Sequence, residues 1–263
     1  MRGCLIGLVI VLTWVHPGPV HAIYGGAVVP ATQGKALVKF SWRKGARSGS
    51  CSGVLIASRA VLTAAHCVRS PKYGNLRVAK VRIGNPKGKT LKVNVASIHV
   101  HPQFKRQRPE SGYDIAVLLL KKAVKGRQPM PLARADQDPT QGKRVMAWGF
   151  GLTMKRGRTV RSRRLRQAQL WSLSPFGCFS GPVKKMAKTR ICAASPRAGV
   201  CPGDSGGPIT RTLGGVDVVY GLSSVTLNRR SCANSQVIMT RVSAFADWIA
   251  TVMAKTTRKS GAK

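Results

Sequence analysis

Two short segments of the chain combine the residue types that nucleophilic catalysis needs. Ser205 lies in the segment Gly203-Asp204-Ser205-Gly206-Gly207, and His66 follows Thr63-Ala64-Ala65. A serine hydroxyl is a weak nucleophile at neutral pH, so it needs a neighbouring base to take its proton. Flanking glycines allow a tight turn whose amide N–H groups can face a developing oxyanion. Together, and in this order, the two motifs indicate Ser205 as a nucleophile and His66 as its general base.

From residue 23 to the vicinity of residue 254, the chain resembles the trypsin/chymotrypsin-type serine proteases. The matching segments are Ile23-Tyr24-Gly25-Gly26, Thr63-Ala64-Ala65-His66-Cys67, Asp114-Ile115-Ala116-Val117-Leu118, Trp148-Gly149 and Gly203-Asp204-Ser205-Gly206-Gly207-Pro208. The chain order His, Asp, Ser is that of the chymotrypsin fold. The resemblance implies hydrolysis of peptide bonds in protein or peptide substrates. Asp114 would orient His66, and the backbone N–H groups of Gly203 and Ser205 would form the oxyanion hole.

The elements that must position these residues read as strands. Short β-rich runs broken by Gly, Pro and Asn predict an all-β sandwich or barrel, and 263 residues suffice for a substantial core. Examples of these runs are Ala36–Trp42, Gly53–Ile56, Ala60–Thr63, Val78–Ile83, Leu91–Val95, Ile115–Leu120, Arg144–Trp148, Leu165–Trp171, Val216–Gly221 and Val237–Val242. The resemblance makes them two six-stranded Greek-key β-barrels, with His66 and Asp114 on the first and Ser205 on the second.

One helix is expected at the end of the domain. Apolar residues recur there at helical spacing behind Ser243, a residue type that caps helix N-termini. They are Phe245, Trp248, Ile249, Val252 and Met253. We expect the protease domain to span residues 23–254 and the polar, basic residues 255–263 to form a disordered tail.

The first 22 residues have the composition of a secretory signal peptide. Arg2 is followed by an apolar run, Cys4–Val15, and by the small-residue segment Val20-His21-Ala22. The run is short for a bilayer span, although an uncleaved anchor remains the alternative. We therefore predict a signal peptide over residues 1–22, a secreted (extracellular or periplasmic) protein and no transmembrane span after cleavage.

Cleavage after Ala22 would make Ile23 the new N-terminus. In the family that the chain resembles, such an amine pairs with the aspartate before the nucleophile, which is Asp204 here. A buried carboxylate is costly without a partner, so the ammonium would make this position tolerable. Since no propeptide is visible between signal and domain, we expect signal peptidase itself to generate the active form.

Seven cysteines include Cys4 in the predicted signal, which leaves six. An even number in a secreted chain favours disulfides over metal, but spacing alone leaves the pairing open. The resemblance implies Cys51–Cys67, Cys178–Cys192 and Cys201–Cys232. His99 and His101 would share one face of a strand, but no third ligand is evident. We expect no metal and no cofactor.

The resemblance also assigns a substrate pocket. Where trypsin has the aspartate that binds Lys or Arg, this chain has Gly199, followed by Val200. Thr226 and Val237 align with wall positions where trypsin has glycines, and Ser224 aligns with a serine beside the triad aspartate. Bulkier walls imply a shallow apolar pocket that, as in elastase, prefers small P1 residues such as Ala, Val or Thr.

The charge balance is extreme, with 45 Lys and Arg against 7 Asp and Glu, a formal net charge of +38. Such a field attracts polyanions, namely nucleic acid, anionic glycans or acidic envelope polymers. General adaptation of the surface is the alternative. The segment Lys155–Arg166 and the group Lys184, Lys185, Lys188 and Arg190 are candidate landing sites for polyanions. No aromatic residues interleave with these bases, so sequence-specific reading of nucleic acid is not expected.

Two functions remain open from the sequence. The first is an active secreted serine endopeptidase. The second is a cationic polyanion-binding or antimicrobial protein that uses the protease fold as a scaffold, because a fold does not determine function. Scaffold proteins of this kind usually lose a triad member, whereas His66, Asp114 and Ser205 are all present.

Overall fold

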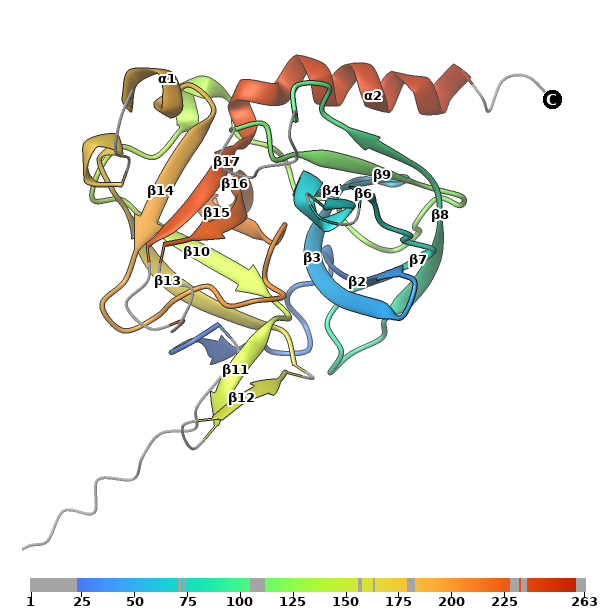
Figure 1. Ribbon diagram of the computed structural model, residues 1–263, viewed down its shortest axis with the longest axis horizontal. Helices are drawn as coiled ribbons and strands as arrows, with labels where there is room; N and C mark the ends of the chain where they lie inside the picture. The colour runs from blue at the N-terminus through green and yellow to red at the C-terminus, as the bar shows by residue number, and fades with distance from the viewer. Residues whose placement is uncertain are drawn as a thin grey trace, which may run out of the picture.

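The computed structural model describes residues 23–70, 72, 74–104, 112–155, 158–162, 164–178, 183–227, 232 and 236–258. Two β-barrels lie side by side, and a helix runs along one side of the pair (Figure 1). The predicted signal peptide, residues 1–22, lies outside the described residues. Within them, no helix is both long and apolar enough to cross a membrane.

Six antiparallel strands close the first barrel in the order β2-β3-β4-β9-β8-β7. Their bounds are β2 Leu37–Lys44, β3 Arg47–Ala57, β4 Ala60–Thr63, β7 Lys80–Ile83, β8 Leu91–Val100 and β9 Ala116–Leu120. Alternate residues of β2 and β7 point inward, so that Val38, Phe40, Val81 and Ile83 join one buried cluster. Their neighbours on the same strands point outward, a division that matters for the charged surface described below.

The second barrel also closes with six strands, because β13 pairs with both β10 and β14. Their bounds are β10 Arg144–Gly149, β13 Arg166–Ser172, β14 Arg190–Ala194, β15 Pro208–Leu213, β16 Val216–Thr226 and β17 Val237–Arg241. The short strand β1, Ala27–Val28, adds to the edge of β13. The predicted fold, two six-stranded barrels, is therefore confirmed.

Short elements complete the chain. Two hairpins pair β5 with β6 and β11 with β12. The bounds are β5 Arg69–Ser70, β6 Gly74–Asn75, β11 Leu152–Lys155 and β12 Arg158–Arg161. A short helix that the sequence did not predict, α1, spans Val183–Ala187.

The C-terminal helix α2, Ala246–Arg258, follows a 3-10 turn at Val242–Phe245. Its apolar residues Ile249 and Val252 belong to a buried cluster with residues of both barrels, including Leu62 and Leu222. The predicted amphipathic helix is present, and it extends to Arg258, so the first residues of the expected tail 255–263 are helical. The helix packs where the two barrels meet and therefore helps to hold them together.

The predicted helix cap at Ser243 is wrong. Ser243 lies inside the 3-10 turn, and its hydroxyl donates a 2.7 Å hydrogen bond to Oδ2 of Asp138. The same carboxylate oxygen accepts a hydrogen bond from Nε of Arg241. A cap precedes the first helical residue and accepts a hydrogen bond from a backbone N–H, whereas Ser243 lies inside the turn and its hydroxyl donates to Asp138 and accepts from Nε of Arg241. The contact with Asp138 is long-range, and the local pattern did not reveal it.

The six cysteines among the described residues form disulfides in the pairing that the resemblance implied, Cys51–Cys67, Cys178–Cys192 and Cys201–Cys232. The first joins β3 to the turn that carries His66. The third joins the turn that carries Ser205 to the segment between β16 and β17. Two of the three cross-links thus constrain the surroundings of the predicted catalytic residues.

Candidate active site

His66 lies at the edge of the first barrel, in the 3-10 turn Ala65–Cys67 that follows β4. Its backbone N–H donates a 2.8 Å hydrogen bond to Oδ1 of Asp114, and its Nδ1 lies 2.7 Å from Oδ2 of the same carboxylate. A histidine held at both its backbone and its ring has a set orientation. An Nδ1–H bonded to a carboxylate directs the lone pair of Nε2 outward, as a general base requires.

Asp114 immediately precedes Ile115 and β9, and its side chain is fully buried. Burial opposes its ionisation, but the charge of His66 and hydrogen bonds from His66 and Ser224 hold the pKa of Asp114 below its ordinary value. Its backbone carbonyl also accepts a 2.8 Å hydrogen bond from the hydroxyl of Thr240 on β17. Contacts from both barrels thus keep this carboxylate charged and in place.

Ser224 reaches Asp114 because β16 is irregular. The pairing of β16 with β17 shifts register between Ser223 and Val225, which leaves Ser224 in a bulge. Bulges re-aim side chains, and here the Ser224 hydroxyl donates a 2.5 Å hydrogen bond to Oδ2 of Asp114. The contact that the resemblance implied for this serine is therefore present.

Ser205 lies in a tight turn between the second barrel and β3 of the first. Its carbonyl accepts a 2.9 Å hydrogen bond from the N–H of Ser52, and the N–H of Gly206 donates a 2.7 Å bond to the carbonyl of Ser223. Gly206 has φ +75°, and a Cβ there would collide with the hydroxyl of Thr63. The glycine is thus required both by backbone conformation and by space.

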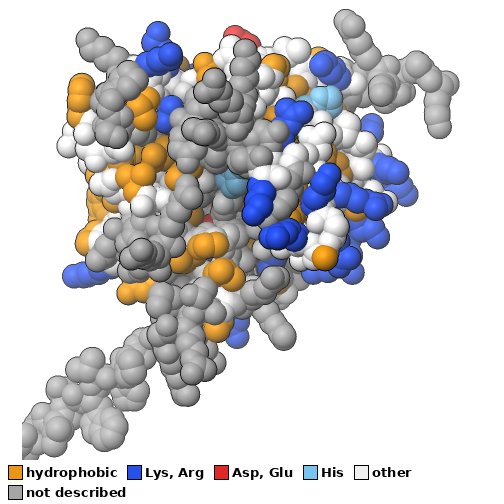
Figure 2. All heavy atoms as spheres, in the orientation of Figure 1, with side chains coloured by type: hydrophobic (Ala, Val, Ile, Leu, Met, Phe, Trp, Pro, Cys, Tyr) orange, Lys and Arg blue, Asp and Glu red, His pale blue; other side chains and the backbone are white. Residues whose placement is uncertain are grey.

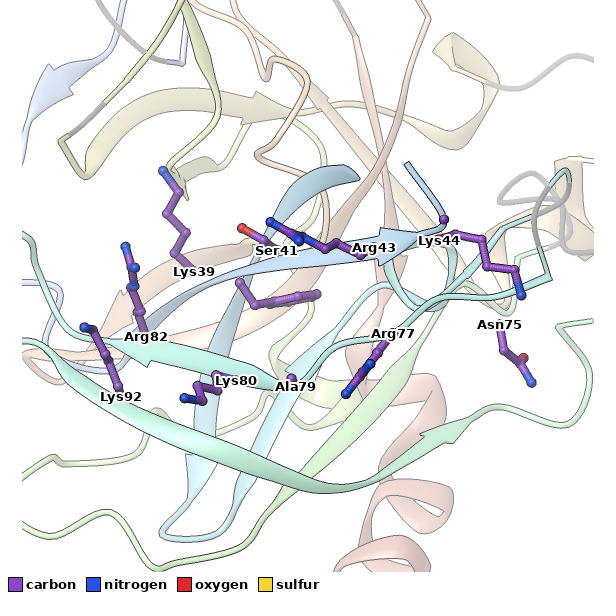
Figure 3. A pocket seen from close by; sticks show the side chains of 12 residues that line it. Lys39, Ser41, Arg43, Lys44, Asn75, Arg77, Ala79, Lys80, Arg82 and Lys92 are labelled. Carbon is purple, nitrogen blue, oxygen red and sulfur yellow. The ribbon is translucent and has the colours of Figure 1, made fainter. Parts of the chain in front are cut away.

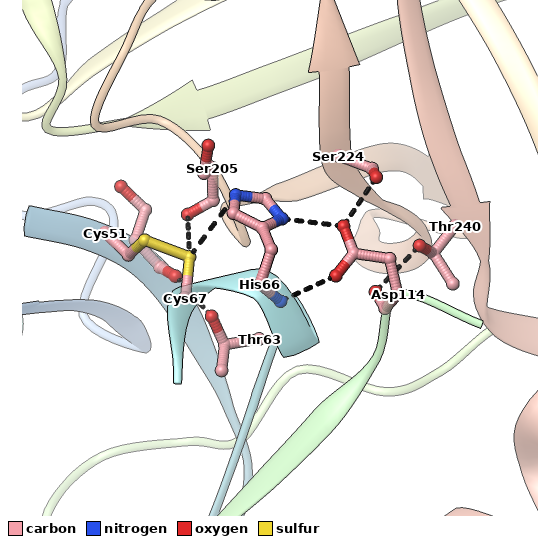
Figure 4. Close-up of polar contacts among 9 residues, drawn as sticks. Cys51, Thr63, His66, Cys67, Asp114, Ser205, Ser224 and Thr240 are labelled. Atoms are coloured by element: carbon pink, nitrogen blue, oxygen red, sulfur yellow. Dashed lines mark hydrogen bonds and ion pairs between the residues drawn. A yellow bond between two sulfur atoms is a disulfide. The ribbon is translucent and has the colours of Figure 1, made fainter. Parts of the chain in front are cut away.

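The imidazole of His66 lies between the other two residues. Figure 4 shows Asp114 on one side of the ring and Ser205 on the other. His66 and Ser205 also line one cavity of about 320 Å³. The structure therefore brings the three residues of the sequence prediction together, although they come from distant parts of the chain and from both barrels.

The backbone N–H groups of Gly203 and Ser205 have no backbone acceptor among the described residues. Gly203 adopts φ +96°, a conformation that favours glycine. Its carbonyl accepts a 2.9 Å hydrogen bond from the hydroxyl of Ser52. This turn therefore keeps two amide donors next to the nucleophile, and donors so placed suit an oxyanion.

Asp204 is buried directly before the serine and accepts hydrogen bonds from the N–H of Gly151 at 2.6 Å and of Cys201 at 2.9 Å. Burial raises its pKa to about 7, against these bonds and the more distant charge of Lys39. None of the ion pairs found among the described residues involves Asp204. In this chain, where Ile23 is still bonded to Ala22, the carboxyl thus has no ion-pair partner among the described residues.

Ile23 is fully buried in the core of the second barrel, in one cluster with Val200. It has φ +45°, and it is the sole residue other than glycine with a positive φ in the part of the chain that the structure describes. A β-branched residue is strained in this region. The next residue, Tyr24, accepts a 3.0 Å hydrogen bond from the N–H of Gly199. The segment is thus hydrogen-bonded to the backbone of Gly199, next to Val200, and its residue Ile23 is strained.

The cavity beside Ser205 has mainly small apolar and hydroxyl walls. The described residues that line it are His66, Val200, Cys201, Pro202, Ser205, Ser223, Ser224, Val225, Thr226 and Cys232. No Asp or Glu is among them, so these residues provide no carboxylate for a Lys or Arg side chain.

Val200, Ser224 and Thr226 were assigned to the pocket from the sequence, and they line it. Val237 does not: it pairs with Thr226 across β16 and β17 and is fully buried in one cluster with Val200. Gly199 is also not among the described lining residues. The sequence prediction missed Pro202, Ser223 and Val225, which lie next to residues that it named.

One further cluster has metal-binding residue types. Ligand atoms of Cys51, His66 and Cys67 lie within 4.8 Å of one another. The two sulfurs are joined in a disulfide, so neither is a thiolate ligand. His99 contacts the hydroxyl of Ser97 at 3.0 Å, and His101 stacks on Tyr113 with ring centroids 5.2 Å apart. The donor set of Cys51, His66 and Cys67 therefore does not fit a metal.

The two basic segments singled out in the sequence are only partly exposed. Arg166 and Arg190 are buried, and burial lowers the pKa of Arg166. Lys185 and Lys188 are exposed, as is Arg164. The side chains of residues 154–159, 161, 163 and 184 lie outside those that the structure describes. The assignment of Arg166 and Arg190 to an exposed landing site is therefore corrected, because neighbouring segments cover both side chains: Nη1 of Arg166 donates a hydrogen bond to the carbonyl of Gly26, and the guanidinium of Arg190 lies against Gly112.

Comparisons with known proteins show the family and the fold of this chain. A family model described as Trypsin matches residues 23–249. Chymotrypsin-like elastase family member 1 of Rattus norvegicus is 33% identical over 215 residues, which are 79% of this chain and 80% of the relative. The protein of the same description from Homo sapiens is 30% identical over 242 residues, which are 88% of this chain and 92% of the relative.

Serine protease Hayan of Drosophila melanogaster is 32% identical over 225 residues, but these are only 34% of that relative. Among solved structures, neuropsin, a serine protease expressed in the limbic system of mouse brain, aligns with a TM-score of 0.68 at 24% identity. The alignment covers 87% of this chain and 98% of that structure. At this level of identity, the structural likeness concerns the fold.

Proposed function

The chain belongs to the trypsin family and is a serine endopeptidase, and we propose that it is a secreted one that works through His66, Asp114 and Ser205 and cleaves after small aliphatic residues. The observation that carries this proposal is the position of the His66 ring. It is held by the Asp114 carboxylate on one side and lines the Ser205 cavity on the other.

In the proposed reaction, the hydroxyl of Ser205 attacks the scissile carbonyl carbon while Nε2 of His66 takes its proton. The C–N bond then breaks, and His66 returns that proton to the departing amine, leaving an acyl-serine. Water, deprotonated by His66, hydrolyses the ester and restores the serine. Asp114 stays ionised throughout and stabilises the imidazolium, a role that its lowered pKa supports.

The oxyanion of each tetrahedral intermediate would be bound by the N–H groups of Gly203 and Ser205. Each such donor contributes a few kcal/mol because it is already oriented before charge develops. Neither N–H donates a hydrogen bond to a backbone carbonyl among the described residues, which supports this assignment.

We further propose that cleavage after Ala22 by signal peptidase activates the chain. The dihedral angle φ of Ile23 exists only while a residue precedes it, so cleavage removes the strain at φ +45°. The freed ammonium would pair with Asp204, whose burial raises its pKa to about 7. Both features support a chain poised for processing at this bond.

The preference for small P1 residues rests on the cavity beside Ser205. Thr226 and Val200 form part of its wall. Val237 does not line the cavity but belongs to the same buried cluster as Val200. Such apolar filling leaves room for Ala, Val or Thr and excludes large side chains. Protein and peptide substrates fit the family.

Labelling with a fluorophosphonate tests the nucleophile. The wild-type chain beginning at Ile23 should label, and Ser205→Ala should abolish both labelling and hydrolysis. Ser223→Ala is the matched control, because Ser223 lines the same cavity without contacting Asp114 in the structure. Loss of labelling in Ser223→Ala alone would move the nucleophile to that residue.

The second candidate function is a cationic polyanion-binding or antimicrobial protein without hydrolysis. The net charge of +38 supports it, whereas the complete His66–Asp114–Ser224 hydrogen-bond network supports catalysis. A wild-type chain that begins at Ile23, binds polyanions and never labels would establish the scaffold function in place of the peptidase.

A further inference from the structure

The outer face of the first barrel carries a groove of about 860 Å³ formed by β2, β7 and the start of β8. Its lining includes seven basic side chains and no acidic one among the described residues: Lys39, Arg43, Lys44, Arg77, Lys80, Arg82 and Lys92. Figure 2 shows Lys and Arg side chains gathered over this barrel, on the right of the view. The groove shares no described lining residue with the Ser205 cavity.

The strand register arranges these cations in rows. Arg82 lies directly opposite Lys39 on one neighbouring strand and Lys92 on the other. Adjacent strands are about 4.8 Å apart, so this row crosses three strands at that spacing. Figure 3 shows the three side chains pointing to the same side of the sheet. The face therefore presents a regular series of positive charges.

A second row continues the series. Arg43 lies opposite Arg77. Lys80 and Arg82 are two residues apart on β7 and so share its outer face, about 7 Å from each other along the strand. The charges thus repeat both along and across the strands.

Five of these charges have no ion-pair partner among the described residues. Arg43, Arg77, Lys80, Arg82 and Lys92 are all exposed, and none of them takes part in the ion pairs found among the described residues. Like charges directly opposite on neighbouring strands destabilise a sheet. A ligand with repeated negative charges would remove this repulsion and stabilise the folded state.

We propose that this groove, lined by β2, β7 and β8, binds a single chain of an acidic polysaccharide through its sulfate or carboxylate groups. Repeated anions on a linear chain match repeated cations on the sheet. The guanidinium groups of Arg43, Arg77 and Arg82 suit such anions because their planar N–H donors bind two oxygens at once.

The lining favours a glycan over nucleic acid. Phe40 is the sole aromatic side chain among the described lining residues, and it is buried in the barrel core. Single-stranded nucleic acid gains much of its affinity from bases stacked on exposed aromatic rings, which this face lacks. A nucleic-acid duplex is a wide, convex cylinder, so it would contact the edges of this groove rather than the residues at its bottom. The groove would hold the enzyme on an acidic matrix while its active site stays open.

Two variants with the same net charge test the location of the site, both in a Ser205→Ala background to prevent self-digestion. The groove variant is Lys80→Gln/Arg82→Gln/Lys92→Gln, and the control is Lys143→Gln/Arg144→Gln/Arg197→Gln, three exposed residues of the second barrel outside the two basic segments named from the sequence. The probe is a size-selected heparin oligosaccharide, titrated calorimetrically at about 0.15 M salt and at several other salt concentrations.

The groove variant should bind at least about tenfold more weakly, and its slope of log K against log salt should fall by roughly 2 for three lost contacts. The control should lose less than about threefold. Without ligand, the groove variant should have the higher melting temperature of the two, because it removes opposed like charges. The single variant Arg82→Gln, the centre of the row, should show the same effects in smaller measure.

Three results would overturn the proposal. Equal weakening by both triple variants would mean that the charge acts diffusely rather than at a groove. Tighter binding of single-stranded or duplex DNA of matched charge, lost in the groove variant, would make nucleic acid the occupant. Absence of oligosaccharide binding to the Ser205→Ala chain would remove the site altogether.

Discussion

Ser224, on a strand of the second barrel, donates a 2.5 Å hydrogen bond to Oδ2 of Asp114, which belongs to the first barrel. The same oxygen lies 2.7 Å from Nδ1 of His66. Asp114 is therefore hydrogen-bonded to residues of both barrels, so its position depends on how the two barrels pack against each other.

Replacing Ser224 by Ala should lower kcat by about tenfold or more with little change in KM. A hydrogen bond to a charged group contributes about 1.5–3 kcal/mol, and its loss leaves a buried carboxylate with one donor fewer. Steady-state kinetics on a small-P1 peptide measures the effect. Ser223→Ala should keep near-normal kcat; an equal loss in both variants would assign the effect to the pocket wall instead of Asp114.

Replacing Asp114 by Asn should reduce kcat by about 10⁴-fold, the loss typical of this triad when the imidazole adopts the wrong tautomer. The geometry should persist, because the amide is the same size as the carboxylate. Binding of a substrate-like inhibitor checks that the cleft is intact. Activity within tenfold of wild type would contradict the role of Asp114.

Two chain starts test the role of Ile23, both in a Ser205→Ala background. In a chain that begins at Ala22, Asp204 keeps a folded-state pKa of about 7 against 3.8 when unfolded. The folded state then binds the extra proton, so the free energy of unfolding should fall as pH rises from about 4 to about 7, by on the order of 4 kcal/mol. In a chain that begins at Ile23, the ammonium should pair with Asp204 and remove this loss.

Denaturant titrations at several pH values measure the difference between these chains. Asp204→Asn in the Ala22 chain is the control and should flatten its pH dependence. Identical pH profiles for the two chain starts would show that the amine of Ile23 does not reach Asp204.

Replacing Thr226 by Gly should widen the cavity beside Ser205. The ratio of kcat/KM for a Phe P1 peptide to that for an Ala P1 peptide should rise by about tenfold or more, since a single methylene changes discrimination by about 1–3 kcal/mol and this replacement removes the whole threonine side chain. Leu227→Ala, at an exposed residue outside the described cavity lining, should leave the ratio unchanged. An unchanged ratio in Thr226→Gly would remove this residue from the specificity pocket.

Comparing Gly206→Ala with Gly214→Ala separates the cost of a steric collision from the cost of backbone strain. Both glycines have positive φ, but a Cβ at Gly206 would collide with Thr63 and Ser52, whereas nothing lies within 4 Å of one at Gly214. Gly214→Ala should cost about 1 kcal/mol of unfolding free energy. Gly206→Ala should cost several times more and abolish hydrolysis. Equal costs would show that the Ser205 turn is not tightly packed.

The sequence indicated much of the fold because its signals are local. The run Ala60–Thr63 coincides with β4, and most other predicted runs overlap observed strands. Arg47–Ser50 was missed because Gly and Ser have low strand propensity, and pairing with β2 determines their conformation. The predicted cap at Ser243 failed for a similar reason, since its partner Asp138 lies far away in the chain.

By itself, the sequence determined the chemistry of this protein. A serine among glycines, a histidine and an aspartate in family order, and an excess of basic residues are properties of residue types and their order. The tertiary structure decided what depends on distant contacts. Examples are the bulge that aims Ser224 at Asp114, the burial of Arg166 and Arg190, and the register that aligns Lys39, Arg82 and Lys92. Pairing between distant strands decides these contacts, and the local sequence around each residue does not show which residue it will contact.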